Sequence, residues 1–423
     1  MGEALLLGGV TLPDGDTADV LLEGGTIAAV SAPGTGPPQV SRRLDLEGYL
    51  LLPAPAEPHA HLDKALTAGR IANPSGDLDG AINAWRAYRA GMDPDDVARR
   101  ATQAALLQLG NGATAIRTHV DVGPDIGLRS MEALIRVREA LRGQVELQLV
   151  VLPTLPLTGA AGATNRALQR AAMEAGADVV GGCPHLDPDP IASQQLCLEL
   201  ALELGRPLDL HSDETLDPTV LHLPELAELV AARGFGHGAA ASHCCSLGMQ
   251  TAELARRVAE QLAAAGVSVI CCPQTNLFLQ ARGHASAPPR GLTAVRALRR
   301  AGVLVAAGGD NLRDPFNSVG RGDPLEVASL LVAAAHLDPG EAYEAVSAVA
   351  RAVMGLPEVR VEPGFPAELL AIRAGSVQEA VAGASPERVV VHQGRVVCRT
   401  TVSRELPGVE APAVAPVASG SAP

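Results

Sequence analysis

Histidine and acidic side chains follow short apolar segments at four widely separated places in this chain. His59 and His61 follow the apolar run 50–56, and they share one face of a strand because strand side chains alternate between faces. The other three places are His211-Ser212-Asp213-Glu214, Ser242-His243 and Gly309-Asp310-Asn311. If the segments before them are neighbouring strands, histidines from three strands and a carboxylate from a fourth meet at one site.

This set of donor atoms is typical of a metal site. His59, His61 and His211 supply neutral imidazoles. Asp310 adds a carboxylate, and the resulting set suits one divalent ion, Zn²⁺ or Fe²⁺, with a position left for water. Such an ion lowers the pKa of bound water from ~15.7 to about 7. Glu214 can carry a proton from that water to a substrate, and His243 can donate a hydrogen bond to the developing oxyanion.

The elements that position these residues alternate between strand and helix patterns. Apolar or β-branched runs occur at 115–120, 145–151, 177–180, 208–211, 239–243, 267–270 and 303–307. With the segment before His59 they make eight strands, separated by helical patterns such as 93–109, where Asp93 can cap the helix and Pro94 suits its first position. Eight βα units predict a closed (β/α)8 barrel of the TIM type, and an open doubly wound sheet is the alternative. In a barrel, active residues lie at the carboxyl ends of the strands.

Both ends of the chain have a β character. Short apolar runs separated by Gly8-Gly9 and Gly24-Gly25 predict hairpins near the N-terminus, and residues 368–372 and 388–397 read as strands near the C-terminus. We therefore expect residues 1–52 and 361–404 to form one small β-sandwich beside a barrel of residues 53–360. Residues 405–423 are Pro, Ala, Ser and Gly with almost no charge, which predicts a disordered tail.

Composition narrows the class of protein. The net charge of -14 argues against nucleic acid or an anionic membrane as a partner. The N-terminus has no basic segment followed by a long apolar run, so we expect neither a signal peptide nor a membrane span. Seven cysteines, an odd number with two adjacent pairs, suit a reducing cytoplasm better than a disulfide framework.

Together these motifs resemble the amidohydrolase superfamily of metal-dependent hydrolases and, more narrowly, its cytosine deaminase group. The shared stretches are 57–63, 117–122, 176–181, 184–185, 211–214, 241–243, 279–282 and 314–316. The resemblance implies one metal ion on His59, His61, His211 and Asp310, with Glu214 as proton shuttle and His243 beside the activated water. Relatives with two metal ions bridge them with a lysine on a middle strand. The only lysine of this chain is Lys64, directly after the first barrel strand, so that bridge is not expected.

Two positions depart from the cytosine deaminase pattern. Thr154 follows Pro153 where the group carries a glutamine that reads the pyrimidine edge, and Asn311 replaces the group's second aspartate. Both changes alter the hydrogen bonds offered to a substrate ring, which argues against cytosine itself. Residues near the same strand ends are predicted to contact substrate, with structural roles as the alternative for His119 and Lys64: Thr154, Asn311, His119, His185, Gln280, Phe316 and Lys64. Trp85 lies in a helical pattern and is expected to pack against neighbouring helices, with a place in the pocket wall as the alternative.

The predicted function is hydrolytic deamination of an amino-substituted nitrogen heterocycle, in which metal-activated hydroxide attacks the ring carbon and ammonia leaves. Asp310 is predicted to pass a proton to the leaving group. One alternative is an amidohydrolase acting on a triazine, another N-substituted heterocycle or a cyclic amide. A second is a non-catalytic small-molecule binder on the same fold. The expected partners are a heterocyclic substrate and water, and the resemblance implies that homo-oligomers are common.

Overall fold

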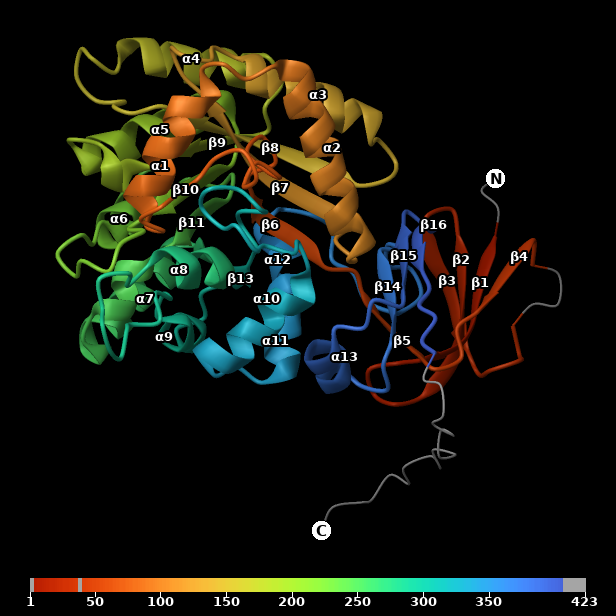
Figure 1. The fold of residues 1–423 in the computed structure, drawn as a ribbon. Coiled ribbons are helices and arrows are strands. Elements are labelled where there is room, and N and C mark those ends of the chain that lie inside the picture. Colours follow the sequence, from red (N-terminus) through yellow and green to blue (C-terminus); the bar gives the residue numbers. More distant parts are fainter. Residues whose placement is uncertain (1–3, 37–39, 406–423) are drawn as a thin grey trace.

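Eight parallel strands form the centre of the computed structural model, which describes residues 4–36 and 40–405 (Figure 1). Each strand is paired in parallel with the next in chain order. The barrel strands are β6 (Ala56–Ala60), β7 (Ala115–Val122), β8 (Glu146–Pro153), β9 (Val179–Gly182), β10 (Leu208–Ser212), β11 (Ala239–His243), β12 (Val267–Cys271) and β13 (Val305–Ala307). This arrangement confirms the predicted (β/α)8 barrel and excludes the open doubly wound sheet.

The first and last barrel strands meet through the Glu57 side chain. Its carboxylate accepts hydrogen bonds from the backbone N–H of His59 at 3.1 Å and of Gly309 at 2.9 Å. One residue farther on, the Asp310 N–H donates to the His59 carbonyl at 2.9 Å. Glu57 therefore holds the segment that carries Asp310 against the segment that carries His59.

Replacement of Gly308 by alanine is expected to lower the free energy of unfolding by about 1 to 3 kcal/mol, the usual cost of overpacking. The added Cβ would meet the Glu57 carboxylate and would lie 3.2 Å from the His59 nitrogen. The midpoint of urea-induced unfolding measures this effect. Gly69→Ala is the matched control, because a Cβ at Gly69 meets no atom within 4 Å and its backbone is not left-handed. Equal midpoints for the two variants would contradict the packing argument.

Helices surround the barrel (Figure 1). Several begin at aspartates whose side chains accept a backbone N–H of the first turn, including Asp77 before α1 and, as the sequence predicts, Asp93 before α2. The helices are α1 (Leu78–Arg89), α2 (Pro94–Gly110), α3 (Arg129–Ala140), α4 (Ala163–Glu174), α5 (Pro190–Leu204), α6 (Leu223–Ala232), α7 (Ala252–Ala265), α8 (Pro273–Leu279), α9 (Val295–Arg300), α10 (Pro324–Leu330), α11 (Pro339–Val346), α12 (Ala348–Val353) and α13 (Val377–Gly383). Within the described residues, none is both long and apolar enough to cross a lipid bilayer.

Strands from both chain ends lie side by side in a second sheet next to the barrel (Figure 1). They are β1 (Leu5–Thr11), β2 (Thr17–Glu23), β3 (Thr26–Ser31), β4 (Arg42–Asp45), β5 (Tyr49–Pro53), β14 (Leu369–Arg373), β15 (Arg388–His392) and β16 (Arg395–Thr400). The expected small β unit from both termini is therefore present. The hairpin predicted at Gly8-Gly9 is wrong, because both glycines lie inside β1, where the register with β2 shifts between Leu7 and Val10. The hairpin at Gly24-Gly25 joins β2 to β3 as predicted.

Neighbouring side chains along the strands of this sheet point to opposite faces, so they belong to two different cores. Leu50, Leu52 and Leu370 belong to the large core that includes the barrel helices. Their neighbours Leu51 and Leu369 pack instead into a separate core within the terminal sheet. One face of the sheet thus packs on the barrel. Of the predicted tail 405–423, residues 406–423 lie outside the described residues.

Candidate active site

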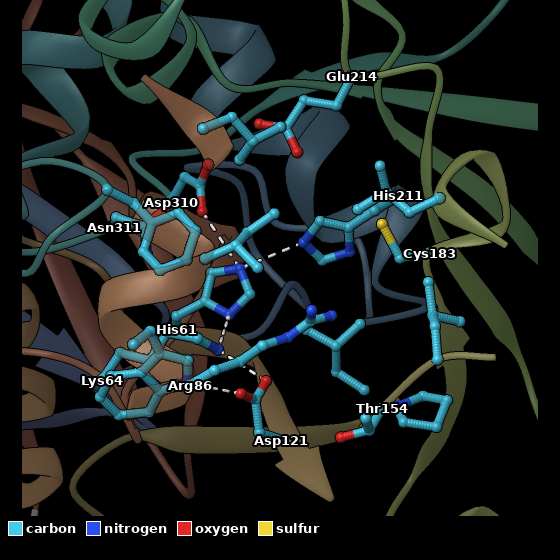
Figure 2. Close-up of a pocket in the computed structure, with 18 of the residues that line it drawn as sticks. His61, Lys64, Arg86, Asp121, Thr154, Cys183, His211, Glu214, Asp310 and Asn311 are labelled. Carbon is cyan, nitrogen blue, oxygen red and sulfur yellow. Dashed lines mark hydrogen bonds and ion pairs between the residues drawn. The ribbon is translucent and has the colours of Figure 1, made fainter. Parts of the chain in front are cut away.

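A pocket of about 750 Å³ opens at the carboxyl ends of the barrel strands (Figure 2). Its wall is largely apolar, with polar groups distributed around it (Figure 2). The residues that line it are His61, Lys64, Leu78, Ile82, Trp85, Arg86, Arg89, Asp121, Leu152, Pro153, Thr154, Leu155, Cys183, Leu186, His211, Glu214, His243, Asp310, Asn311 and Phe316. The location is that of active sites in barrels of this type.

The predicted metal ligands lie together at the inner end of the pocket. His61 Nε2 is 3.2 Å from His211 Nε2 and 3.3 Å from Asp310 Oδ1, and His59 Nε2 is 3.7 Å from the same oxygen. Ligands about 2.0 to 2.2 Å from a tetrahedral Zn²⁺ lie about 3.3 to 3.6 Å from one another. His59 Nε2 and both Asp310 oxygens are buried without a hydrogen-bond partner in the described chain. Such unpaired atoms at ligand spacing fit a bound cation.

The protonation of these groups also suits a cation. Burial, together with the neighbouring positive groups, lowers the pKa of His59, His61 and His211 well below the ordinary value for histidine. Their imidazoles are therefore neutral near pH 7 and can act as ligands. Burial and the nearby Glu214 raise the pKa of Asp310, so a cation beside this carboxylate would favour its ionised form.

Two further side chains come within reach of the same centre. His119 groups with His59 and His211, and Cys272 groups with His59, His243 and Asp310, with the donor atoms of each group lying within 4.8 Å of one another. Both are alternatives to the predicted ligands, and neither lines the pocket.

Hydrogen bonds behind the cluster hold two of the imidazoles in place. Ser242 Oγ lies 3.0 Å from His59 Nδ1 and donates to Asp209 Oδ1 at 2.9 Å. Lys64 Nζ lies 3.2 Å from His61 Nδ1 and donates to Asp121 at 2.8 Å. The Ser242 hydroxyl can accept the Nδ1–H of His59, the kind of partner that fixes the tautomer and orientation of a metal-binding histidine. The Lys64 ammonium can only donate to His61 Nδ1, so it positions that ring without fixing the metal-binding tautomer.

Glu214 and His243 also face the metal-ligand cluster. Glu214 follows β10, the strand that carries His211, and His243 ends β11. His243 Nδ1 is 3.4 Å from Glu214 Oε1 and 4.0 Å from Asp310 Oδ2. Asn276 donates to Glu214 Oε1 at 3.3 Å. Burial raises the pKa of Glu214 to about 8, against the opposing effect of this hydrogen bond. A carboxyl group whose pKa is near the working pH can both accept and release a proton.

Strained backbone accompanies these side chains. Asp213, His243 and Asp310 have φ angles of 48°, 69° and 63°, in the left-handed region that non-glycine residues rarely adopt. Each stands at the end of a barrel strand or shortly after it. His243 and Asp310 line the pocket, whereas the Asp213 carboxylate accepts a hydrogen bond from the backbone N–H of His222. Strain of this kind clusters at functional sites.

Thr154 and Asn311 line the pocket, but other protein groups occupy part of their hydrogen-bonding capacity. The Thr154 hydroxyl accepts from Arg89 Nη2 at 2.7 Å and donates to the Val122 carbonyl at 3.1 Å. The Asn311 amide donates to Asp314 Oδ2 at 2.8 Å, which leaves its oxygen for a ligand. Asn311 therefore offers an acceptor, as the aspartate it replaces would, and Thr154 has little capacity left to read a substrate ring.

The other predicted substrate contacts are distributed over three places. Phe316 and Lys64 line the pocket, although Lys64 is already bound to His61 and Asp121. His185 and Gln280 line an adjoining outer groove that shares Leu78, Leu186 and Glu214 with the pocket. His119 does not line the pocket: its ring lies 4.1 Å from that of His59 and is fully buried, which corrects its predicted place beside the substrate.

One face of α1 forms a wall of the pocket that the sequence reading missed, apart from the alternative place given to Trp85. Leu78, Ile82, Trp85, Arg86 and Arg89 recur at helical spacing and all line the pocket. The expected packing role of Trp85 was incomplete, since its Nε1 also donates to Asp121 at 2.6 Å. The helical spacing of these residues is visible in the sequence, but the sequence does not show that this side of the helix faces the pocket.

Asp121 connects this wall to the metal-side cluster, and its replacement by asparagine is expected to destabilise the protein by about 3 to 5 kcal/mol. Its carboxylate pairs with Lys64 at 2.8 Å and Arg89 at 2.9 Å, and all three side chains are buried. Burial alone would raise the pKa of Asp121, but these two cations lower it to about 2. The loss of the carboxylate charge leaves buried positive charge uncompensated.

Urea-induced unfolding measures this loss. Asp125→Asn is the matched control, because Asp125 also pairs with Arg89 but its side chain is 33% exposed. We expect its effect to be at most about 1 kcal/mol, as for partly solvated pairs. An equal loss of unfolding free energy in both variants would show that Asp121 is not the main counter-ion of the buried Lys64 and Arg89 side chains.

Comparison with known proteins extends over most of the chain. The model of the "Amidohydrolase family" matches residues 42–398. Pterin deaminase from Rhizobium rhizogenes is 34% identical over 388 residues, which cover 90% of this chain and 88% of that protein. The structure of 5-methylcytosine deaminase from Klebsiella pneumoniae with 5-fluorocytosine has a TM-score of 0.87 and 29% identity, and covers 95% of this chain and 99% of the other. N-isopropylammelide isopropylaminohydrolase from Burkholderia multivorans has a TM-score of 0.81 and 31% identity, with 94% and 99% covered.

Proposed function

Because this chain belongs to the amidohydrolase family, we propose that it is a metal-dependent hydrolase that removes the amino group of a nitrogen heterocycle as ammonia. The observation that carries this proposal is the meeting of the buried donor cluster with Glu214 and His243 in one pocket. A non-catalytic binder would not need a proton-carrying carboxyl group beside unpaired ligand atoms.

His59, His61, His211 and Asp310 would hold the metal ion. Their nitrogen and oxygen donors suit Zn²⁺ or Fe²⁺, and such an ion lowers the pKa of a water molecule and so supplies the nucleophile. Ser242 and Lys64 hold the His59 and His61 rings in orientations that direct their Nε2 atoms to Asp310.

The remaining groups move protons and orient the substrate. Glu214 takes a proton from the attacking water and delivers it to the ring nitrogen next to the attacked carbon. His243 stabilises the oxygen that develops negative charge. Asp310 would take the proton of the hydroxyl group on the attacked carbon and pass it to the departing amine as the carbon–nitrogen bond breaks. The oxygen of Asn311 accepts a hydrogen bond from a ring N–H or an amino group. Asn276 keeps the Glu214 carboxyl in position from behind.

A pterin is the first substrate class to test, since pterin deaminase is 34% identical to the chain over 90% of its length. The apolar side chains of Leu78, Ile82 and Phe316 provide flat contacts for a ring system.

Ammonia release by the purified, metal-loaded protein tests the proposal. The panel contains pterin, cytosine, isocytosine, 5-methylcytosine, creatinine and aminotriazines. Release from at least one member, with loss of the amino group from the product, is the expected result. The absence of release from every member, with metal bound, would contradict ring deamination.

Removal of an alkylamine from a triazine is the second candidate. The 31% identity to N-isopropylammelide isopropylaminohydrolase and the leucines of the pocket wall favour it, because an N-alkyl group needs apolar contact. Release of isopropylamine rather than ammonia from N-isopropylammelide would support this candidate over the first.

We also propose a cytoplasmic location. All seven cysteines are free, and five of them are buried, which suits a reducing compartment. Fractionation of the native cells would test the location, and light scattering would test the expected homo-oligomer.

A further inference from the structure

Three cationic side chains line the pocket, and two of them are already neutralised. Lys64 and Arg89 pair with Asp121 at 2.8 and 2.9 Å, and Arg89 also pairs with Asp125 at 2.8 Å. The third, Arg86, makes neither an ion pair nor a hydrogen bond with any residue in the described ranges 4–36 and 40–405. Arg86 is exposed to solvent at the pocket wall, and its guanidinium is free to pair with an anionic group of a ligand.

The position of Arg86 in α1 explains why it faces a ligand. Arg86 lies four residues after Ile82 and one after Trp85, on the helix face that forms the pocket wall. Figure 2 shows its side chain extending into the pocket on the side of Cys183, across from the Glu214 and Asp310 carboxylates. Burial raises the pKa of the Cys183 thiol and Arg86 opposes that rise, as a nearby guanidinium should.

We propose that Arg86 binds a carboxylate substituent of the heterocyclic substrate, so that the preferred substrate is a ring acid rather than the neutral ring. The inference rests on the proposed deaminase function. A guanidinium forms two parallel hydrogen bonds with a carboxylate, and these charge-assisted bonds are stronger than neutral ones. Within the described residues, no carboxylate forms an ion pair with Arg86.

A carboxylate fits this pocket better than a phosphate. Arg86 supplies a single uncommitted positive charge, which a monoanion neutralises.

Matched substrate pairs test this inference: pterin with pterin-6-carboxylate, and cytosine with 5-carboxycytosine. For the ring that is accepted, kcat/KM of the wild type should be about two- to fivefold higher for the acid than for the neutral member, the range for an ion pair with an exposed partner. In Arg86→Gln this preference should disappear, as measured by the ratio of kcat/KM for the acid to kcat/KM for the neutral ring in the same variant. Arg86→Lys should keep part of the preference, because it keeps the charge but not the planar fork.

Arg99→Gln is the matched control, since Arg99 is exposed, pairs with Asp96 and does not line the pocket. Its acid preference should equal that of the wild type. Binding is measured separately, by calorimetry on Glu214→Gln with and without Arg86→Gln. If no panel member is turned over but the acid still binds more tightly only when Arg86 is present, the deaminase proposal fails and the Arg86 assignment stands. Equal acid and neutral affinities, or a preference that survives in Arg86→Gln, would overturn the inference.

Discussion

Replacement of Glu214 by glutamine is expected to reduce kcat by about 10²- to 10⁴-fold, the usual contribution of a general acid–base group. Glutamine keeps the volume and can still hydrogen-bond Asn276, so the pocket should retain its shape. It cannot take up and release a proton, although burial has brought the pKa of Glu214 to about 8 for that purpose. Steady-state turnover of the accepted substrate, with metal content measured on the same sample, gives the result.

The control for this change is Glu326→Gln. Glu326 is also partly buried and hydrogen-bonds Gln274, but it does not line the pocket. Its kcat should stay within about twofold of the wild type, as for a change outside the reacting groups. If Glu214→Gln also kept its rate with a full complement of metal, Glu214 would not be the proton carrier and the proposed mechanism would fall.

Removal of either His61 or His211 is expected to abolish stoichiometric metal binding. Their Nε2 atoms face each other at 3.2 Å, and His61 Nε2 is also 3.3 Å from Asp310. Outer partners of metal ligands are worth about 10- to 100-fold in affinity, so loss of a ligand should weaken binding by more than about 100-fold. Metal per chain in His61→Ala and His211→Ala, measured by plasma emission after dialysis, gives the result, and circular dichroism verifies folding.

The neighbouring groups supply the controls. His119 and Cys272 come within 4.8 Å of members of the same cluster, yet neither is a predicted ligand. His119→Ala and Cys272→Ser should therefore keep about one metal ion per chain. Loss of metal in His119→Ala with retention in His61→Ala would replace the predicted ligand set by His59, His119 and His211.

Much of the architecture could be predicted because it depends on local pattern. Alternation of short apolar runs with capped helices specified βα units, and eight such units close into a barrel. The same logic predicted that His59, His61, His211 and Asp310 would meet, since the carboxyl ends of parallel strands share one rim. Gly8-Gly9 was misread because a glycine pair is compatible with a bulge inside one strand as well as with a turn.

Side-chain partners were beyond a sequence reading because they join distant segments. From the sequence alone, the Thr154 hydroxyl would be available to a substrate. The fold places Arg89 Nη2 of α1 2.7 Å from that hydroxyl. Asn311 can donate or accept in principle, and only the contact with Asp314 leaves its oxygen available. His119 lies near the carboxyl end of a barrel strand, as the histidines that line the pocket do. Its ring nevertheless packs against the His59 ring and does not line the pocket.

The sequence by itself thus determined the barrel, its terminal β unit and the set of chemical groups at the strand ends, because strand and helix periods and strand direction are encoded locally. Only the tertiary structure decided which polar groups are free to meet a ligand. Hydrogen bonds and ion pairs across the fold use up Lys64, Arg89 and Thr154, whereas Arg86 is left unpaired among the described residues. That difference depends on distances of a few ångströms between elements remote in the chain, and no local pattern encodes them.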